Sequence, residues 1–175
     1  MMPSIELRLQ TMAKAMNEII LPAIAPTNGL AREQAQLMIA QIAMIGQHWQ
    51  KAHAYDALAL REIAALGRVL AASAAGGTKT EAAAAILQKT LQECDTTSAS
   101  PAELRAVIAD AIDKLVIASG LDGSDAFRQS SFDTILEHGA LQAWRDRVWF
   151  AGCGMDPERA DLPSIDEMLA KAGVR

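Results

Sequence analysis

The sequence predicts an all-α protein, an antiparallel bundle of six to seven helices that forms one domain over residues 1–175. Apolar residues recur every three or four positions along most of the chain, which is the period of an amphipathic helix. The alternating pattern of strands is missing, and aromatic residues make up only 4% of the chain. Proline, glycine and capping residues separate the periodic segments at short intervals.

Proline and glycine set the boundaries of the helices in the first half. Pro22 is expected to kink or end the first helix. Asp56 is expected to cap the third helix, which stops at Gly76 and Gly77. The predicted helices cover about residues 4–24, 30–52, 56–75, 78–93, 101–119, 124–151 and 164–172.

Three later helices begin with a hydroxyl residue followed three positions on by glutamate, which is the capping-box pattern. The clearest case has Pro101 at the first helical position after Ser100. The three pairs are Thr78 with Glu81, Ser100 with Glu103, and Ser164 with Glu167.

Composition narrows the class of protein. The net charge of −5 and the absence of any Lys/Arg run argue against a non-specific grip on nucleic acid. Cys94 and Cys153 form no CxxC pair, which favours a reducing compartment. No basic-then-apolar leader and no apolar run of about 18 residues is found. We therefore expect a cytoplasmic protein that binds neither nucleic acid nor membrane.

One predicted helix is unusually poor in charge. Between residues 19 and 50 only Arg32 and Glu33 are charged, whereas a surface helix normally has a wide charged face. A helical projection places three polar residues at seven-residue spacing inside an apolar arc. They are Gln34, Gln41 and His48.

Buried amides and imidazoles need hydrogen-bond partners, because leaving one unsatisfied costs about 1–3 kcal/mol. Three interpretations stay open. The polar residues bind neighbouring helices, fix the register of a two-fold interface, or line a ligand pocket. The candidate pocket or interface residues are Gln34, Gln41, His48, Trp49, His53 and Tyr55.

Methionine favours adaptable surfaces, and six of the eight methionines lie in residues 1–44. Near residue 150 two tryptophans are interleaved with Arg145 and Arg147, a composition typical of interface anchors. This cluster is interpreted as core, as a partner surface, or as a grip for a phosphate-bearing ligand. The candidate partner-surface residues are Met38, Ile42, Trp144, Arg145 and Trp149.

Catalytic and metal motifs are not found. The segment around Lys79 lacks the glycines of a phosphate-binding loop. His48 and His53 point about 140° apart on one helix, and no HExxH, ExxH or GxSxG pattern occurs. We predict no catalytic residue, no metal ion and no cofactor.

The segment over residues 21–37, LPAIAPTNGLAREQAQL, resembles small uncharacterised bacterial all-helical proteins associated with acyl-CoA dehydrogenases, and the resemblance covers about the first seventy residues. It implies an accessory role near acyl-CoA chemistry and supplies no catalytic residue. The sequence therefore predicts a non-enzymatic interaction or accessory module that acts through a homodimer. The alternative is a protein or enzyme that binds a small apolar ligand of acyl or acyl-CoA type, in a pocket lined by residues 30–52.

Overall fold

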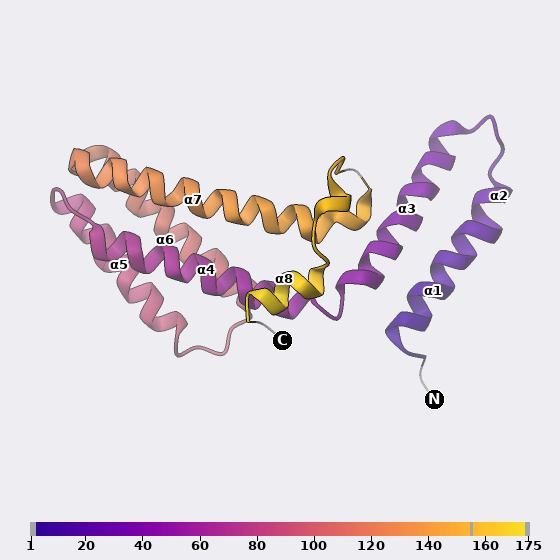
Figure 1. Ribbon diagram of the computed structural model, residues 1–175, viewed down its shortest axis with the longest axis horizontal. Helices are drawn as coiled ribbons and strands as arrows, with labels where there is room; N and C mark the ends of the chain where they lie inside the picture. Colours follow the sequence, from indigo (N-terminus) through magenta and orange to yellow (C-terminus); the bar gives the residue numbers. More distant parts are fainter. Residues whose placement is uncertain (1–2, 155, 174–175) are drawn as a thin grey trace. The chain divides into compact units, whose positions relative to one another are not determined.

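The computed structural model describes residues 3–154 and 156–173, and it confirms the all-α prediction (Figure 1). Within this described part, extended pairing is limited to one bridge between Gly76 and Gly123. The elements are α1 (Ile5–Ala15), a π-helical turn (Met16–Ile20), α2 (Leu21–Ala23), α3 (Gly29–His48), α4 (Ala52–Ser73), α5 (Thr78–Cys94), α6 (Pro101–Asp122), α7 (Asp125–Phe150), 3₁₀ turns at Ala151–Cys153 and Arg159–Asp161, and α8 (Ile165–Lys171).

The chain separates into two compact units, which are described one at a time. The hairpin unit holds the described residues up to Ala52 together with Trp149–Leu162. The core unit holds His53–Val148 and the described residues from Pro163 onward. A single domain stays a prediction.

In the hairpin unit, α1 lies antiparallel to α3 (Figure 1). Leu9 and Met16 of α1 and Ala35 of α3 are buried. The first helix changes to a π-helical turn before Pro22, where the Leu21 N–H donates to the Met16 carbonyl. A proline lacks an N–H and its ring collides with the carbonyl four residues earlier, so a wider turn accommodates it without ending the helix.

Arg32 closes the hairpin. Its Nη1 donates to the carbonyl of Leu21 at 3.2 Å and to that of Ile24 at 3.1 Å. A cation suits this place because the carbonyls at the end of a helix lack intrahelical partners. The Asn28 side chain accepts from the Ala31 N–H at 3.3 Å and begins α3.

The core unit is built around a cluster of apolar side chains from α4, α5, α6 and α7. Leu87 and Leu115 lie at its centre and are almost completely buried. The short residues Ala64, Gly67 and Ala84 let the helices approach closely. The buried members of the cluster are Ala64, Leu66, Leu70, Ala84, Leu87, Leu91, Ile108, Ala111, Ile112, Leu115 and Phe127.

One predicted helix start is wrong. The helix expected after Asp56 begins at Ala52 as α4, so Asp56 lies inside it. A turn separates α3 from α4, and it is closed by a 2.8 Å hydrogen bond from the Lys51 N–H to the His48 carbonyl. Neither proline nor glycine marks this turn in the sequence. The start of the helix was therefore predicted at Asp56, the nearest residue that commonly caps helices.

The start of α5 is capped from outside the helix. Asp122 accepts from the Lys79 N–H at 2.8 Å, and from the Thr80 N–H at 3.0 Å and hydroxyl at 2.6 Å. These bonds, with that from the Thr80 hydroxyl foremost, hold the pKa of Asp122 below its usual range. The predicted Thr78–Glu81 box is therefore wrong, because Gly77 is the capping position. The boxes at Ser100 and Ser164 are confirmed.

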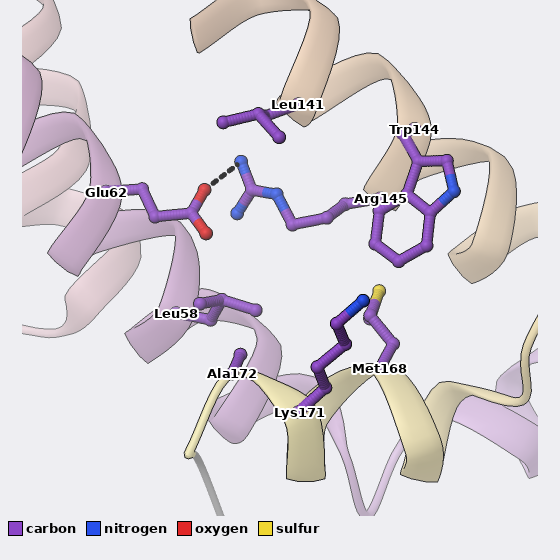
Figure 2. Close-up of a pocket in the computed structure, with 8 residues that line it drawn as sticks. All are labelled: Leu58, Glu62, Leu141, Trp144, Arg145, Met168, Lys171 and Ala172. Carbon is purple, nitrogen blue, oxygen red and sulfur yellow. Dashed lines mark ion pairs between the residues drawn. The ribbon is translucent and has the colours of Figure 1, made fainter.

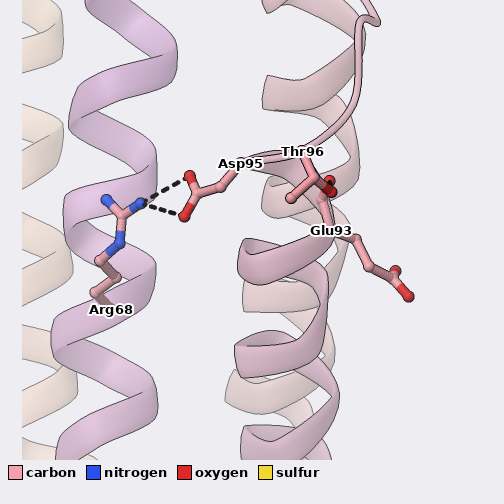
Figure 3. A network of polar contacts seen from close by, with 4 residues as sticks. All are labelled: Arg68, Glu93, Asp95 and Thr96. Atoms are coloured by element: carbon pink, nitrogen blue, oxygen red, sulfur yellow. Dashed lines mark hydrogen bonds and ion pairs between the residues drawn. The ribbon is translucent and has the colours of Figure 1, made fainter.

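The other end of α5 is tied to α4 by an exposed ion pair (Figure 3). Arg68 Nη2 lies 3.1 Å and 3.3 Å from the two carboxylate oxygens of Asp95. The Thr96 hydroxyl donates to the Glu93 carbonyl at 3.0 Å and holds the turn that follows the helix. Exposed pairs contribute only about 0–1 kcal/mol, so this contact orients the loop more than it stabilises the fold.

Candidate functional site

The charge-poor helix is α3, and its outward side is apolar and exposed. Gln34 and Gln41 lie on this side and are exposed to solvent. A projection at 100° per residue places the neighbouring apolar residues in the same arc. These exposed residues are Leu30, Leu37, Met38 and Ile45.

Helix α1 and the π-helical turn that follows it extend the same surface. Ile5, Met12 and Ile19 recur every seven residues and are also exposed. The projection turns them away from the groove of about 280 Å³ between Ala13 and Ala43, on the other side of the hairpin. We call the combined surface the hairpin face. It consists of Ile5, Met12, Ile19, Leu30, Gln34, Leu37, Met38, Gln41 and Ile45.

His48, the third member of the seven-residue row, is buried instead. Its ring stacks on Trp149, with centroids 4.4 Å apart, and meets Phe150 edge-on at 6.2 Å. Burial lowers the pKa of His48, an effect opposed by a hydrogen bond to the Trp149 backbone and assisted by the charge of Lys51. Because His48 Nε2 has no hydrogen-bond partner among the described residues, His48 serves packing in the hairpin unit.

This environment predicts a loss of stability in mild acid. The unfolded chain protonates His48 near pH 6.5, whereas the folded protein resists protonation, so the stability is present above that pH and falls as the pH drops toward the folded pKa. His48→Phe keeps the ring stack and removes the titration. We expect it to change the free energy of unfolding at about pH 7.5 by no more than about 1 kcal/mol, and to flatten the decline toward about pH 5.5.

Urea unfolding at a series of pH values measures this effect. His138 also has a pKa lowered by burial, so part of the decline remains in His48→Phe. His53→Phe is the matched control, because it makes the same substitution at an exposed histidine. Equal pH slopes for the wild type and His48→Phe would contradict the assignment.

The six predicted pocket residues are divided between the two units, so a site that joins all of them stays a prediction. Trp49 belongs to the hairpin unit and its Nε1 has no hydrogen-bond partner among the described residues. His53 and Tyr55 belong to the core unit. There the Tyr55 hydroxyl donates to Asp146. Burial raises the pKa of Tyr55, and that bond and the Asp146 charge raise it further.

Two predicted partner-surface residues, Trp144 and Arg145, line a pocket in the core unit (Figure 2). The pocket has a volume of about 340 Å³ and lies between α4, α7 and α8. Its apolar wall comes from Leu58, Leu141, Trp144, Met168 and Ala172. Its charged residues are Glu62, Arg145 and Lys171.

A buried ion pair lies at one wall of this pocket. Arg145 Nη2 is 2.7 Å from Glu62 Oε2, and the Arg145 side chain is 5% exposed against 30% for Glu62. The contact lacks hydrogen-bond alignment, since Glu62 Oε2 has no hydrogen-bond partner in the described chain. Arg145 Nε and Nη1 are likewise buried without partners there. Burial and the charge of Arg145 lower the pKa of nearby His138.

Sequence reasoning selected Trp144 and Arg145 by their composition but missed the rest of the pocket. Glu62, Met168 and Lys171 come from helices distant in the chain, so no local pattern joins them to Arg145. The one signal in the sequence that could have indicated the pocket is Arg145, a charged residue at a core position of a helix. Arg145 follows His138 by seven residues on α7.

The described residues contain no group of three or more His, Cys, Asp or Glu side chains placed to hold a metal ion. The pKa of the Cys94 thiol is raised by burial and by the carboxylates of Asp95 and Glu93, which opposes formation of a reactive thiolate.

In comparisons with known proteins, no family model matches the chain, and neither a curated protein nor a solved structure matches it. Within the described residues, no helix is both long enough and apolar enough to span a membrane.

Proposed function

We propose that this protein is a non-enzymatic interaction module that self-associates through the hairpin face. The supporting observation is that an uncharged arc of α3 exposes apolar side chains to solvent over the whole helix. Large exposed apolar patches on a folded protein mark sites of interaction. The unpartnered face is therefore a better indication of function than any polar cluster in the chain.

The spacing on both helices suits helix packing. In α1 and the turn after it, Ile5, Leu9, Met12, Met16 and Ile19 alternate steps of four and three residues. In α3 the same steps connect Leu30, Gln34, Leu37, Gln41 and Met44. This repeat places side chains where knobs-into-holes packing of a helix bundle requires them. Two hairpins meeting face to face complete a four-helix arrangement.

The occupant that fits this face best is a second copy of the chain. A two-fold interface joins the same surface of both copies, so that surface must be complementary to itself. The outward arc of α3 has no charge to repel itself, and a glutamine amide both donates and accepts hydrogen bonds. Gln34 and Gln41 can therefore pair with their counterparts and fix the register. Arg8, at the edge of the face, can remain in solvent.

The area of the face is at the lower end of what a specific dimer buries. A helix is about 10 Å across and rises about 1.5 Å per residue, so two paired helices of about 20 residues present roughly 600 Å². A standard interface buries about 800 Å² on each partner. An accessory role beside an acyl-CoA dehydrogenase, which the resemblance implies, is part of the same proposal.

Met38→Glu tests the dimer. Met38 is 54% exposed, so the substitution leaves the fold intact and places two carboxylates inside the proposed interface. We expect the dissociation constant to rise roughly 100-fold or more, measured by sedimentation equilibrium of the full chain. Ile42→Glu is unsuitable, because Ile42 lies in the groove between α1 and α3 and would disturb the hairpin.

Ile86→Glu on α5 is the matched control, because Ile86 is 56% exposed and lies in the core unit. It should leave the dimer unchanged. Leu136→Glu examines the exposed apolar residues of α7. A wild-type monomer at high concentration, or a dimer broken by Leu136→Glu and not by Met38→Glu, would disprove the assignment to the hairpin face.

A further inference from the structure

We propose that the core-unit pocket binds a small organic carboxylate with an apolar body. This inference is independent of the dimer, since every residue that lines the pocket belongs to the core unit. It rests on a cation that the fold buries without satisfying it, at the wall of an otherwise apolar cavity.

The buried cation is Arg145, which is 4% exposed. Its contact with Glu62 involves Nη2, and the donors Nε and Nη1 have no hydrogen-bond partner among the described residues. Buried donors are nearly always paired, so two unpaired nitrogens on one guanidinium are unusual. A bidentate carboxylate uses one edge of a guanidinium, either Nε with Nη2 or Nη1 with Nη2, so a ligand bound in this way shares Nη2 with Glu62.

The charges around the cavity favour an anion. Arg145 and Lys171 are cationic and Glu62 is anionic, so the lining has one more positive than negative charge. In Figure 2 the Arg145 guanidinium lies beside Glu62, while Lys171 and Met168 reach toward the cavity from α8. Lys171 is exposed and can supply a second contact to an acidic group.

The other residues that line the pocket are apolar, so they favour a ligand whose remaining part is apolar. Leu58, Leu141, Trp144 and Met168 surround the space beside the ion pair. Ligand pockets are mostly apolar with a few convergent polar groups, and range from about 300 to 1,000 Å³. A cavity of about 340 Å³ is at the small end of that range. The ligand class is therefore a compact amphipathic monocarboxylate rather than a nucleotide.

Isothermal titration of the full chain with sodium octanoate and with 1-octanol tests the proposal. The two probes have the same chain length and differ in the acidic group. We expect octanoate to bind at least ten times more tightly than 1-octanol. Equal affinity for the two probes would show that the pocket recognises only the apolar chain and not the carboxylate, which would overturn the proposal. No binding of octanoate would overturn it as well.

Three substitutions locate the site without disturbing the core. Lys171→Gln should weaken octanoate binding by roughly 2- to 5-fold, as expected for a partly exposed ion pair. Lys89→Gln removes an exposed lysine of α5 and should leave affinity unchanged. Leu141→Trp adds bulk at an exposed lining residue and should abolish binding. Full octanoate affinity in Leu141→Trp, or equal losses in Lys171→Gln and Lys89→Gln, would place the carboxylate elsewhere.

Discussion

Replacing Gly76 by alanine is expected to lower the free energy of unfolding by about 2–4 kcal/mol. A Cβ at this position would stand 2.6 Å from the Asp122 carbonyl oxygen and 2.6 Å from the Gly123 Cα. Both obstacles are backbone atoms, so no side chain can rotate away. The loops α4–α5 and α6–α7 would have to separate.

That separation would break several hydrogen bonds at once. The Gly77 N–H donates to the Asp122 carbonyl at 2.8 Å, and the Ser124 N–H donates to the Ala75 carbonyl at 2.9 Å. The Asp122 carboxylate also caps the start of α5. A movement of the two loops therefore weakens the cap, and the fully buried Thr80 loses the acceptor of its hydroxyl.

Urea unfolding followed by circular dichroism measures the effect, with Gly120→Ala as the control. Gly120 lies within α6, and a Cβ there meets no atom within 4 Å. Alanine in a helix interior is more favourable than glycine by about 1 kcal/mol, so this variant should become more stable. Similar stability of Gly76→Ala and Gly120→Ala would disprove the tight approach of the two loops.

The contrast between these two glycines shows what a sequence can reveal. Gly76 and Gly77 were correctly expected to separate two helices, because glycine interrupts helical periodicity. These two positions must be glycine because Asp122, which lies more than forty residues away, packs closely against both of them. Asp122 also caps α5 in place of Thr78. Local patterns identify a helix end, but they do not identify a cap supplied by a distant segment.

The candidate sites also combine features that the local sequence reveals with features that contacts between distant segments decide. The absence of charge on α3 was visible in the sequence, and the structure exposes Met38 and Ile45 on that helix. His48 continues the row of Gln34 and Gln41 in sequence, yet Trp149 covers it. Seven-residue spacing places residues on one side of a helix, while a contact from a distant segment decides which of them reach solvent.

Replacing Glu62 by leucine is expected to destabilise the core unit by about 3–5 kcal/mol. The substitution leaves the Arg145 guanidinium buried with neither a countercharge nor hydrogen bonds to Nε and Nη1. Arg145→Met should cost less, because Glu62 is 30% exposed and can turn into solvent. Unfolding in urea measures both variants.

The double variant Glu62→Leu/Arg145→Met separates the cost of an unpaired charge from the value of the pair. A buried ion pair often contributes no more than apolar residues of similar volume. We therefore expect the double variant to recover most of the stability that Glu62→Leu loses. Additive losses would instead show that the two side chains act independently. Recovery would support a fold that keeps a buried cation for a purpose other than stability, as binding a carboxylate in the adjoining pocket requires.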